Sequence, residues 1–269
     1  MKAIPVNSSH NNALKRVRAL HQRGHREKEH QFIIEGIKLL REAVAKGIRI
    51  LDVVTSEAFW QNESMNTDLA FLEDSRISTV HVADDKLFKE LITTQTSCGI
   101  VAVGEQPEWT LQDCIGGSNP FVLVGEAIQD PGNAGTLVRA ALAFGCTGLI
   151  FSKGSVDAFN PKVVRSAMGA LFELPVITGL ELTEVMKQIK EKSIRTIALE
   201  PTASTPLDVA DLSGPIAILL GNEGNGLTES GLALADELVT IPISQATESL
   251  NVAMCGAIVL YQCALQRRK

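Results

Sequence analysis

The fold of this chain is decided by an apolar run and the turn after it, Ile216-Ala217-Ile218-Leu219-Leu220 followed by Gly221-Asn222-Glu223-Gly224-Asn225-Gly226-Leu227. The apolar run predicts a buried β-strand, and the glycines predict a loop at its end. A second strand-like run ends in Ile241-Pro242-Ile243, and Ser249-Leu250-Asn251 then opens an apolar helix. Two such turns at the ends of buried strands are typical of a ligand crevice built mainly from backbone groups.

The alternation of strands and helices extends back to residue 121. Short apolar runs predict strands at residues 121–124, 148–151, 174–177, 195–199, 216–220 and 238–243. Helices fit between them at residues 134–144, 161–171, 181–192 and 228–235, with a last one at residues 250–266. Apolar strands separated by helices indicate a parallel sheet covered on both faces.

The front of the chain carries its own alternating pattern. Helical spacing is present at residues 11–22 and 35–46, and strand-like runs lie at residues 32–34, 50–55, 79–82 and 99–103. This pattern predicts a small α/β domain with its own sheet. Residues 106–119 break this alternation and contain Pro107, Gly116, Gly117, Ser118 and Asn119, which predicts a linker. We therefore expect a domain at residues 1–105, a linker at 106–119 and a second domain at 120–269.

The bulk composition excludes several classes of protein. With 45% hydrophobic and 21% charged residues the chain has globular composition. No run approaches the roughly 20 apolar residues of a membrane span, and the first residues have no apolar signal core, so we expect a soluble, cytoplasmic protein. The five cysteines are widely spaced and form no C-x-x-C pair, which favours buried thiols over a disulfide framework or a metal site.

Positive charge is concentrated at the front of an acidic chain. Residues 1–50 hold eleven Lys or Arg against four Glu, although the net charge of the whole chain is −6. Such a run is commonly a solvated helix face, and it is also what a nucleic-acid contact requires. The charge pattern alone leaves both interpretations open. The clustered cations are Lys15, Arg16, Arg18, Arg23, Arg26 and Lys28.

Two further segments carry candidate functional residues. After the strand at residues 121–124 comes a loop with Asn133 and a helix with Arg139, an order typical of phosphate-binding turns. The segment has neither G-x-G-x-x-G nor G-x-x-x-x-G-K-[ST], which disfavours a dinucleotide-binding dehydrogenase and a Walker loop. Arg139 is either a solvated edge residue or a placed cation. Lys162 and Arg165 share one helix face and are either surface charge or a polyanion-binding pair.

In the glycine-containing turn at residues 221–227, Glu223 is either simply exposed or an anchor for an arginine such as Arg139. Ser249 is either a helix cap or a functional hydroxyl. The final helix contains Ala253, Gly256 and Ala257, and such small residues allow close backbone approach.

Four motifs in this order resemble the SpoU (TrmH-like) RNA ribose 2′-O-methyltransferases. They are Asn133-x-Gly135 with Arg139, Asn160 to Gly169, Leu220-Gly221-Asn222-Glu223-Gly224-x-Gly226-Leu227, and Ile241-Pro242 with Ser249-Leu250-Asn251-Val252-Ala253. Residues 11–36 and 96–103 are similar to the small substrate-binding domain of many members, itself like a ribosomal RNA-binding protein. One departure is Ser244-Gln245, where many members have a Met or a Gly-containing turn.

The resemblance implies a parallel-sheet α/β domain of the SPOUT class with a deep trefoil knot, its last helix threaded behind residues 221–227. It implies S-adenosylmethionine as the cofactor, held around Gly221, Ile241 and Leu250 with Leu220 and Asn222. Arg139 is expected against the ribose 2′-hydroxyl, with Glu223 holding Arg139 by an ion pair. Asn133, Ser249 and Asn251 are expected to orient the nucleotide and the loops.

The same resemblance implies RNA as the partner and a homodimer formed through the second domain. From the cysteine spacing and the lack of a long apolar run we expect no metal and no membrane partner. Ribosomal RNA is the preferred substrate because of the front domain, with transfer RNA as the alternative. The basic front end is then expected to bind RNA, as are Lys162 and Arg165, in their own or the partner subunit's site. A non-catalytic RNA-binding protein and a base methyltransferase are the rival interpretations. The nucleotide that is modified and the proton acceptor stay open.

Overall fold

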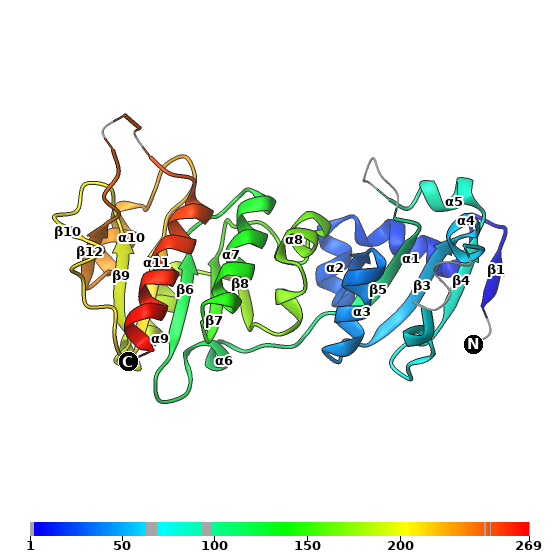
Figure 1. Ribbon diagram of the computed structural model, residues 1–269, viewed down its shortest axis with the longest axis horizontal. Coiled ribbons are helices and arrows are strands. Elements are labelled where there is room, and N and C mark those ends of the chain that lie inside the picture. Colours follow the sequence, from blue (N-terminus) through cyan, green and yellow to red (C-terminus); the bar gives the residue numbers. More distant parts are fainter. Residues whose placement is uncertain (1–2, 63–68, 93–97, 245, 248, 269) are drawn as a thin grey trace. The chain divides into compact units, whose positions relative to one another are not determined.

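The protein was analysed as a computed structural model that describes residues 3–62, 69–92, 98–244, 246–247 and 249–268 (Figure 1). The chain divides into two compact units. Unit 1 contains residues 1–107 and 159–172, and unit 2 contains residues 108–158 and 173–269.

The core of unit 2 is a parallel sheet of seven strands within the described residues, in the order β10-β12-β9-β11-β6-β7-β8. Strand β11 lies in its interior, where Ile216 pairs with Phe121 on one side and with Arg195 on the other. Every residue of β11 is buried, which explains its unbroken apolar sequence. The strands are β6 (Phe121–Gly125), β7 (Gly148–Ser152), β8 (Val176–Leu180), β9 (Arg195–Leu199), β10 (Thr205–Pro206), β11 (Ile216–Leu220) and β12 (Glu237–Thr240).

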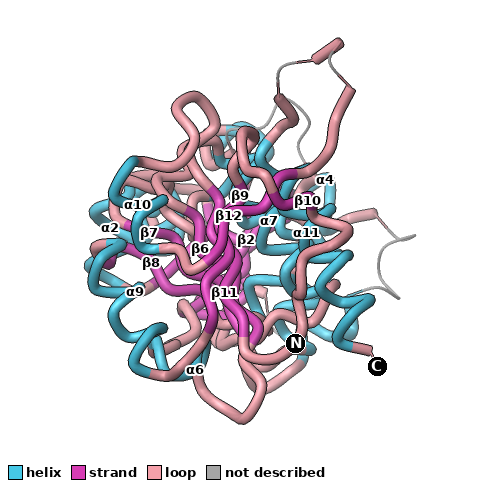
Figure 2. Tube along the Cα trace, turned by 90° about the vertical axis from the view of Figure 1, so that its left-hand side faces the viewer, coloured by secondary structure: helices cyan, strands magenta, loops and turns pink. Residues whose placement is uncertain are grey.

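Helices cover both faces of this sheet (Figure 2). Helices α6 (Leu111–Ile115), α9 (Leu182–Glu191) and α10 (Glu229–Leu234) lie on one face, and α7 (Pro131–Ala143) and α11 (Val252–Arg267) lie together on the other. A Cβ atom on Gly256 of α11 would lie 2.3 Å from Leu137 of α7 and 3.1 Å from Leu220 of β11. The close approach predicted for the small residues of the last helix is therefore present at Gly256.

Two helix boundaries differ from the predicted ones for clear local reasons. Helix α7 begins at Pro131, three residues earlier than predicted, because the Asp130 side chain accepts a hydrogen bond from the Asn133 amide at 2.9 Å and Pro131 fits the first turn. Helix α8 (Pro161–Ala167) ends four residues early because Met168 and Gly169 have φ angles of 49° and 84°. A short 3₁₀ turn, η2 (Ala170–Phe172), follows.

Unit 1 contains a mixed sheet in the order β1-β4-β3-β5-β2, in which β3 runs parallel to β4 and antiparallel to β5. Its core packs Leu14, Val17 and Leu20 of the first helix against the sheet and Phe88. The strands are β1 (Ile4–Val6), β2 (Gln31–Glu35), β3 (Ile50–Ser56), β4 (Val80–Ala83) and β5 (Ile100–Glu105). The helices are α1 (Asn12–Leu20), α2 (Arg23–Glu29), α3 (Ile37–Ala45), α4 (Glu57–Trp60) and α5 (Asp85–Lys89).

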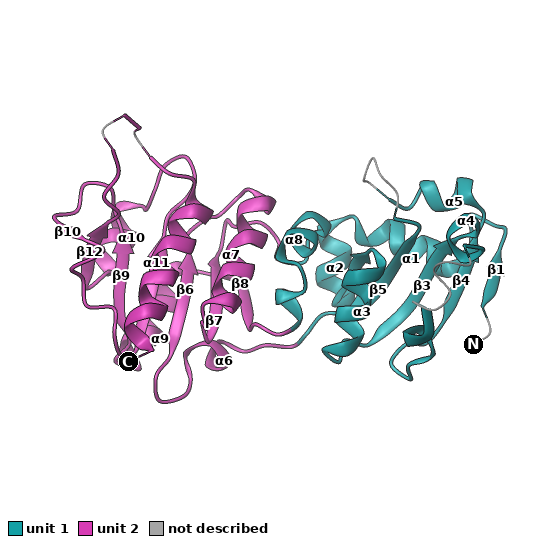
Figure 3. Cartoon of the chain, viewed as in Figure 1, with its two compact units in different colours: residues 1–107, 159–172 teal, residues 108–158, 173–269 magenta. Residues whose placement is uncertain are grey.

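Residues 159–172 join unit 1 through aromatic contacts (Figure 3). The ring of Phe32 on β2 lies 5.2 Å from that of Phe159 and 5.9 Å from that of Phe172, and Phe32 is fully buried. The domain limits drawn from the sequence at residues 105 and 120 stay a prediction. Helix α8 lies after residue 120 in the sequence, within the predicted second domain, but it packs against β2 as part of unit 1.

Candidate active site

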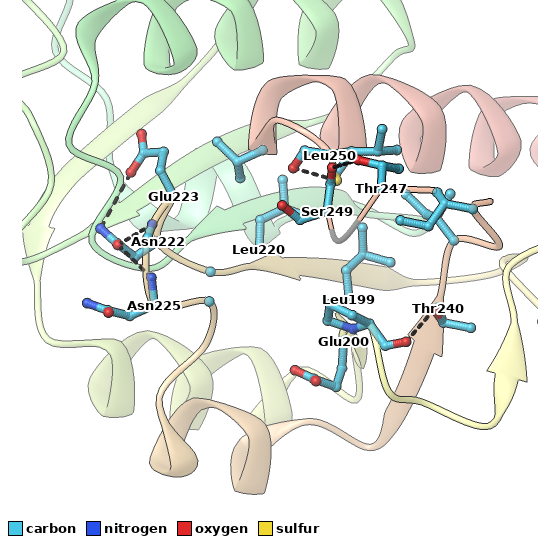
Figure 4. A pocket seen from close by; sticks show the side chains of 18 of the residues that line it. Leu199, Glu200, Leu220, Asn222, Glu223, Asn225, Thr240, Thr247, Ser249 and Leu250 are labelled. Atoms are coloured by element: carbon cyan, nitrogen blue, oxygen red, sulfur yellow. Dashed lines mark hydrogen bonds between the residues drawn. The ribbon is translucent and has the colours of Figure 1, made fainter. Parts of the chain in front are cut away.

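The carboxyl ends of β9, β11 and β12 meet the start of α11 around a cavity of about 570 Å³ in unit 2 (Figure 4). This edge of a parallel sheet is where such folds bind their ligands, and the volume suits a nucleotide-sized molecule. All five residues predicted to hold a cofactor line the cavity, together with Glu223 and Ser249. The five are Leu220, Gly221, Asn222, Ile241 and Leu250.

The loop after β11 is a closed turn. Asn222 and Gly226 exchange two backbone hydrogen bonds of 2.9 and 3.0 Å. The Asn222 side chain accepts from the amide of Gly224 at 2.9 Å and donates to the carbonyl of Ala127 at 2.8 Å. A Cβ atom on Gly221 would lie 2.1 Å from the carbonyl carbon of Gly226, so no side chain fits there. The glycine thus lets the backbone itself form one wall of the cavity.

Glu223 is held by residues at and just before the start of α7. Its carboxylate accepts from the amides of Gln129 and Asp130 at 3.1 and 3.0 Å and from the Asn133 side chain at 3.1 Å. Burial raises the pKa of the Glu223 carboxyl, but the hydrogen bonds from Asp130, Asn133 and Gln129 outweigh it and hold the pKa below its ordinary value. A carboxylate is also favoured at the amino end of a helix.

A chain of hydrogen bonds joins three of the predicted site residues. Asn251 caps α11 by accepting from the amides of Ala253 and Met254, and its amide group donates to Asn133 at 2.9 Å. Asn133 in turn donates to Glu223. The motifs around residues 133, 223 and 251 are therefore brought together, although they are far apart in the sequence.

The predicted ion pair between Glu223 and Arg139 is not formed among the described residues, and this prediction was wrong. The Glu223 carboxylate is turned toward α7's first turn by three donors, whereas Arg139 lies two turns further along the helix. Arg139 is exposed and does not line the cavity, and it has no hydrogen-bond or ion-pair partner in the described part of the chain. Its guanidinium is accordingly available to a ligand.

Ser249 lines the cavity and does not cap α11, because Asn251 takes that position. Glu126, a buried carboxylate that follows β6, was not predicted as a site residue from the sequence. Glu126 accepts from the amide and the hydroxyl of Thr228 at 3.0 and 2.7 Å, and its own amide donates to Leu220. It thereby ties the two ends of the 221–227 loop. Its position directly after an apolar strand is the feature of the sequence from which Glu126 could have been predicted as a site residue.

Most cations of the basic front end are already paired within unit 1. Arg16 forms an ion pair with Asp52, Arg18 with Glu90 at 3.1 Å and Arg23 with Glu27 at 2.7 Å. Lys28 lies 3.4 Å from Glu29, and Lys15 is exposed. Except for Arg16, whose partner Asp52 is buried, these pairs are exposed, and exposed ion pairs are weak and can be exchanged for other anions.

Arg26 was predicted to contact RNA, and its burial contradicts this. It is 2% exposed, and its guanidinium donates to the carbonyl of Leu20 at 2.6 Å. The sequence of α2 is mostly charged and contains no apolar side chains that would predict which face of the helix is buried. Arg165 forms a 2.9 Å ion pair with Glu35 in unit 1, and Lys162 is exposed on the same helix.

Two absences hold within the described ranges. No helix there is both long and apolar enough to cross a membrane. The same residues contain no group of three or more His, Cys, Asp or Glu side chains that could hold a metal ion.

The fold and this cavity define a parallel-sheet α/β protein with a ligand site built from loops at the carboxyl edge of its sheet. Residues 120–261 match the SpoU rRNA Methylase family, and the chain belongs to that family. Residues 11–102 match the MRM3-like substrate binding domain. The fold class predicted from the sequence, a parallel-sheet α/β domain with a smaller α/β domain before it, is confirmed.

Individual relatives extend over nearly the whole chain. A 23S rRNA (guanosine(2553)-2′-O)-methyltransferase of Bacillus subtilis is 28% identical over 95% of this chain and 97% of its own. An uncharacterized tRNA/rRNA methyltransferase of Synechocystis is 30% identical over 97% of this chain and 94% of its own. The crystal structure of the SpoU methyltransferase AviRb from Streptomyces viridochromogenes, in complex with AdoMet, has a TM-score of 0.87 at 26% identity. That comparison covers 97% of this chain and 99% of AviRb.

Proposed function

We propose that this protein transfers the methyl group of S-adenosylmethionine to a ribose 2′-hydroxyl of ribosomal RNA. The observation that carries the proposal is the hydrogen-bond chain Asn251–Asn133–Glu223 beside the cavity under the Gly221 turn. Family membership supports the reaction class, and the name of the Bacillus subtilis relative supports the 2′-hydroxyl and ribosomal RNA as the target.

The cavity fits the cofactor in its chemistry as well as its size. Its walls include the closed 221–226 turn, where a Cβ atom is excluded, and the apolar side chains of Leu199, Leu220 and Leu250. Backbone groups can hold the polar edge of an adenine and the ribose hydroxyls, while apolar side chains cover the ring faces. When bound, S-adenosylmethionine supplies a methyl group activated by a positively charged sulfur.

The protein then has to orient the nucleotide and stabilise charge on the attacking oxygen. The positively charged guanidinium of Arg139 would stabilise the alkoxide that develops as the 2′-hydroxyl loses its proton. Asn133 and Asn251 hold the loops in place through their shared hydrogen bond. Glu223, fixed by two backbone amides, keeps Asn133 oriented and does not neutralise Arg139.

The test is methyl transfer from labelled S-adenosylmethionine to purified ribosomal RNA, followed by digestion and mass spectrometry of the nucleosides. We expect label on 2′-O-methyl nucleosides. Arg139→Ala should lower the rate at least about a hundredfold and leave cofactor affinity unchanged, because one preorganised charged donor contributes about 10²–10³ in rate. Label on a base, or labelling only of transfer RNA in a parallel reaction, would contradict the proposed substrate.

A homodimer formed through unit 2 is part of the proposal. Four large apolar side chains lie exposed along one side of α11: Met254, Ile258, Tyr261 and Leu265. Such a stripe is typical of an interface between subunits.

In sedimentation velocity, Tyr261→Glu should shift the protein toward monomer. Lys187→Glu, at an exposed residue of α9 on the opposite face of the sheet, is the control and should sediment like the wild type. A monomeric wild type would refute the dimer. The cytoplasmic location stays a prediction.

A further inference from the structure

The ion pair between Glu35 and Arg165 joins two parts of unit 1 that are far apart in the sequence. Glu35 ends β2, and its side chain is 3% exposed. Arg165 lies on α8, is 34% exposed, and donates to Glu35 Oε2 at 2.9 Å. The other carboxylate oxygen of Glu35 is buried and has no hydrogen-bond partner among the described residues. Arg165 is therefore the counter-charge on which this buried carboxylate depends.

Packing around the pair fixes the whole segment 159–172 on β2. Val163, Val164 and Ala167 of α8 are buried, and the rings of Phe159 and Phe172 lie against Phe32. The ion pair lies at the carboxyl end of β2, three residues beyond Phe32. The segment thus belongs to the substrate-binding unit by its contacts, although both of its ends continue into unit 2.

The chain just before this segment is bonded to the loop that holds Glu223. Val156 donates its amide to Ile128 at 2.8 Å, and the Ser155 hydroxyl accepts from the Ile128 amide at 3.1 Å. Ile128 directly precedes Gln129 and Asp130, whose amides bind the Glu223 carboxylate. Only residues 157 and 158 separate Val156 from Phe159. A covalent and hydrogen-bonded path therefore leads from α8 to the Glu223 site.

We propose that Glu35 and Arg165 are positioning residues that latch segment 159–172 to the substrate-binding unit, so that the state of this unit is conveyed to the Glu223 loop. Arg165 acts through Glu35 and not by contact with an RNA phosphate. The inference rests on the proposed function for its effect on methyl transfer. Its structural part concerns residues 126–130 and 159–172 and can be measured without any reaction.

Three variants of the full-length protein test the latch: Glu35→Gln, Arg165→Gln and the double variant. Arg49→Gln is the matched control, since Arg49 forms an exposed ion pair with Glu105 in the same unit. Hydrogen exchange followed by mass spectrometry should show faster exchange at residues 159–172 and 126–130 in all three latch variants, and wild-type exchange in the control. Faster exchange at residues 159–172 with unchanged exchange at 126–130 would overturn the latch.

Methyl transfer at saturating RNA gives the second readout. Each single latch variant should lower kcat about tenfold, with the double variant no lower than either single, because coupled residues are not additive. Cofactor affinity and the salt dependence of RNA binding should not change. A direct phosphate contact predicts the opposite pattern: Arg165→Gln would flatten the salt dependence, and Glu35→Gln would tighten RNA binding. That pattern would overturn the proposal, whereas a wild type without methyl transfer would refute the proposed function and leave the exchange experiment to decide.

Discussion

Asn11 and Asn251 cap helices α1 and α11 with almost the same geometry, with ψ angles of 139° and 138° and two first-turn amides bound by each side chain. In unit 1 the Asn11 side chain makes no further hydrogen bond among the described residues. In unit 2 the amide group of Asn251 reaches Asn133 and, through it, Glu223. The same local signal thus marks a simple cap in one unit and a site residue in the other, and only the tertiary partner separates them.

The surroundings of the two caps differ in the same way. Near α1 the cations are matched by Asp52, Glu90 and Glu27, so charge is satisfied locally. Near α11 the polar groups come from three distant segments and lie beside a cavity of which backbone forms one wall. Interactions set by backbone geometry tolerate little change, whereas exposed charges can exchange partners.

The largest expected effect is at Gly221. Gly221→Ala places a methyl carbon 2.1–2.5 Å from backbone atoms of Gly226 and Leu227, much closer than van der Waals contact, so the turn must open. We expect a loss of about 1–3 kcal/mol in the free energy of unfolding. Cofactor affinity in calorimetry should fall at least about a hundredfold, since about 2.7 kcal/mol of contacts would be lost. Gly24→Ala on helix α2, where nothing lies within 4 Å, should leave cofactor affinity unchanged and raise the free energy of unfolding by up to about 1 kcal/mol. Unaltered binding by Gly221→Ala would remove this turn from the cofactor site.

The two caps provide the next test. Asn251→Asp keeps the capping oxygen and removes the amide donor to Asn133. We expect unfolding stability within about 0.5 kcal/mol of wild type and a fall in kcat of about tenfold, equal to about 1.4 kcal/mol. Asn11→Asp should leave both unchanged, as measured by denaturant titration and methyl transfer. Equal activity of the two variants would erase the distinction between the caps.

Neutralising Arg16, Arg18, Arg23 and Lys28 to Gln should weaken RNA binding moderately. If each cation meets one phosphate, the slope of log affinity against log salt should flatten by about 3–4. Filter binding at several salt concentrations measures it. Lys187→Gln, at an exposed ion pair in unit 2, is the control. A slope equal to that of wild type would leave the front end as a solvated, internally paired surface.

The smallest expected effect is on the stability of the protein at acidic pH. Because the pKa of Glu223 is lowered in the folded protein, its ionised form contributes stability above the ordinary carboxyl pKa, and this contribution is lost as pH falls through the lowered value. Glu223→Gln should therefore unfold with a weaker dependence on pH below about 4.5 than wild type. Thermal melts in acidic buffers test this. If the melting temperatures of the two proteins changed equally with pH, the hydrogen bonds assigned to the Glu223 carboxylate would be contradicted.

Backbone signals in the sequence predicted the fold and the cavity well. Apolar runs predicted the strands of the unit 2 sheet within a few residues, and the glycine-rich turn predicted one wall of the cavity, because both depend on local geometry. The two-residue strand β10 and the charged helix α2 were not predicted, because neither shows a periodic pattern of apolar residues. Partner choice among charges could not be predicted. Glu223 selected backbone amides over Arg139, and Arg26 turned inward, since these outcomes depend on tertiary distances that no spacing encodes.

The interior position of β11 constrains the order in which this protein can form during synthesis. Its neighbour β6 leaves the ribosome about 95 residues earlier and must wait for β11 before its outer edge is paired. At about 5–20 residues per second this wait lasts roughly 5–20 s. Unit 1 waits as well, because its last segment ends at residue 172. Until β11 is made, the edge of β6 that β11 covers has no partner strand in this sheet, and unpaired apolar edges of this kind favour aggregation.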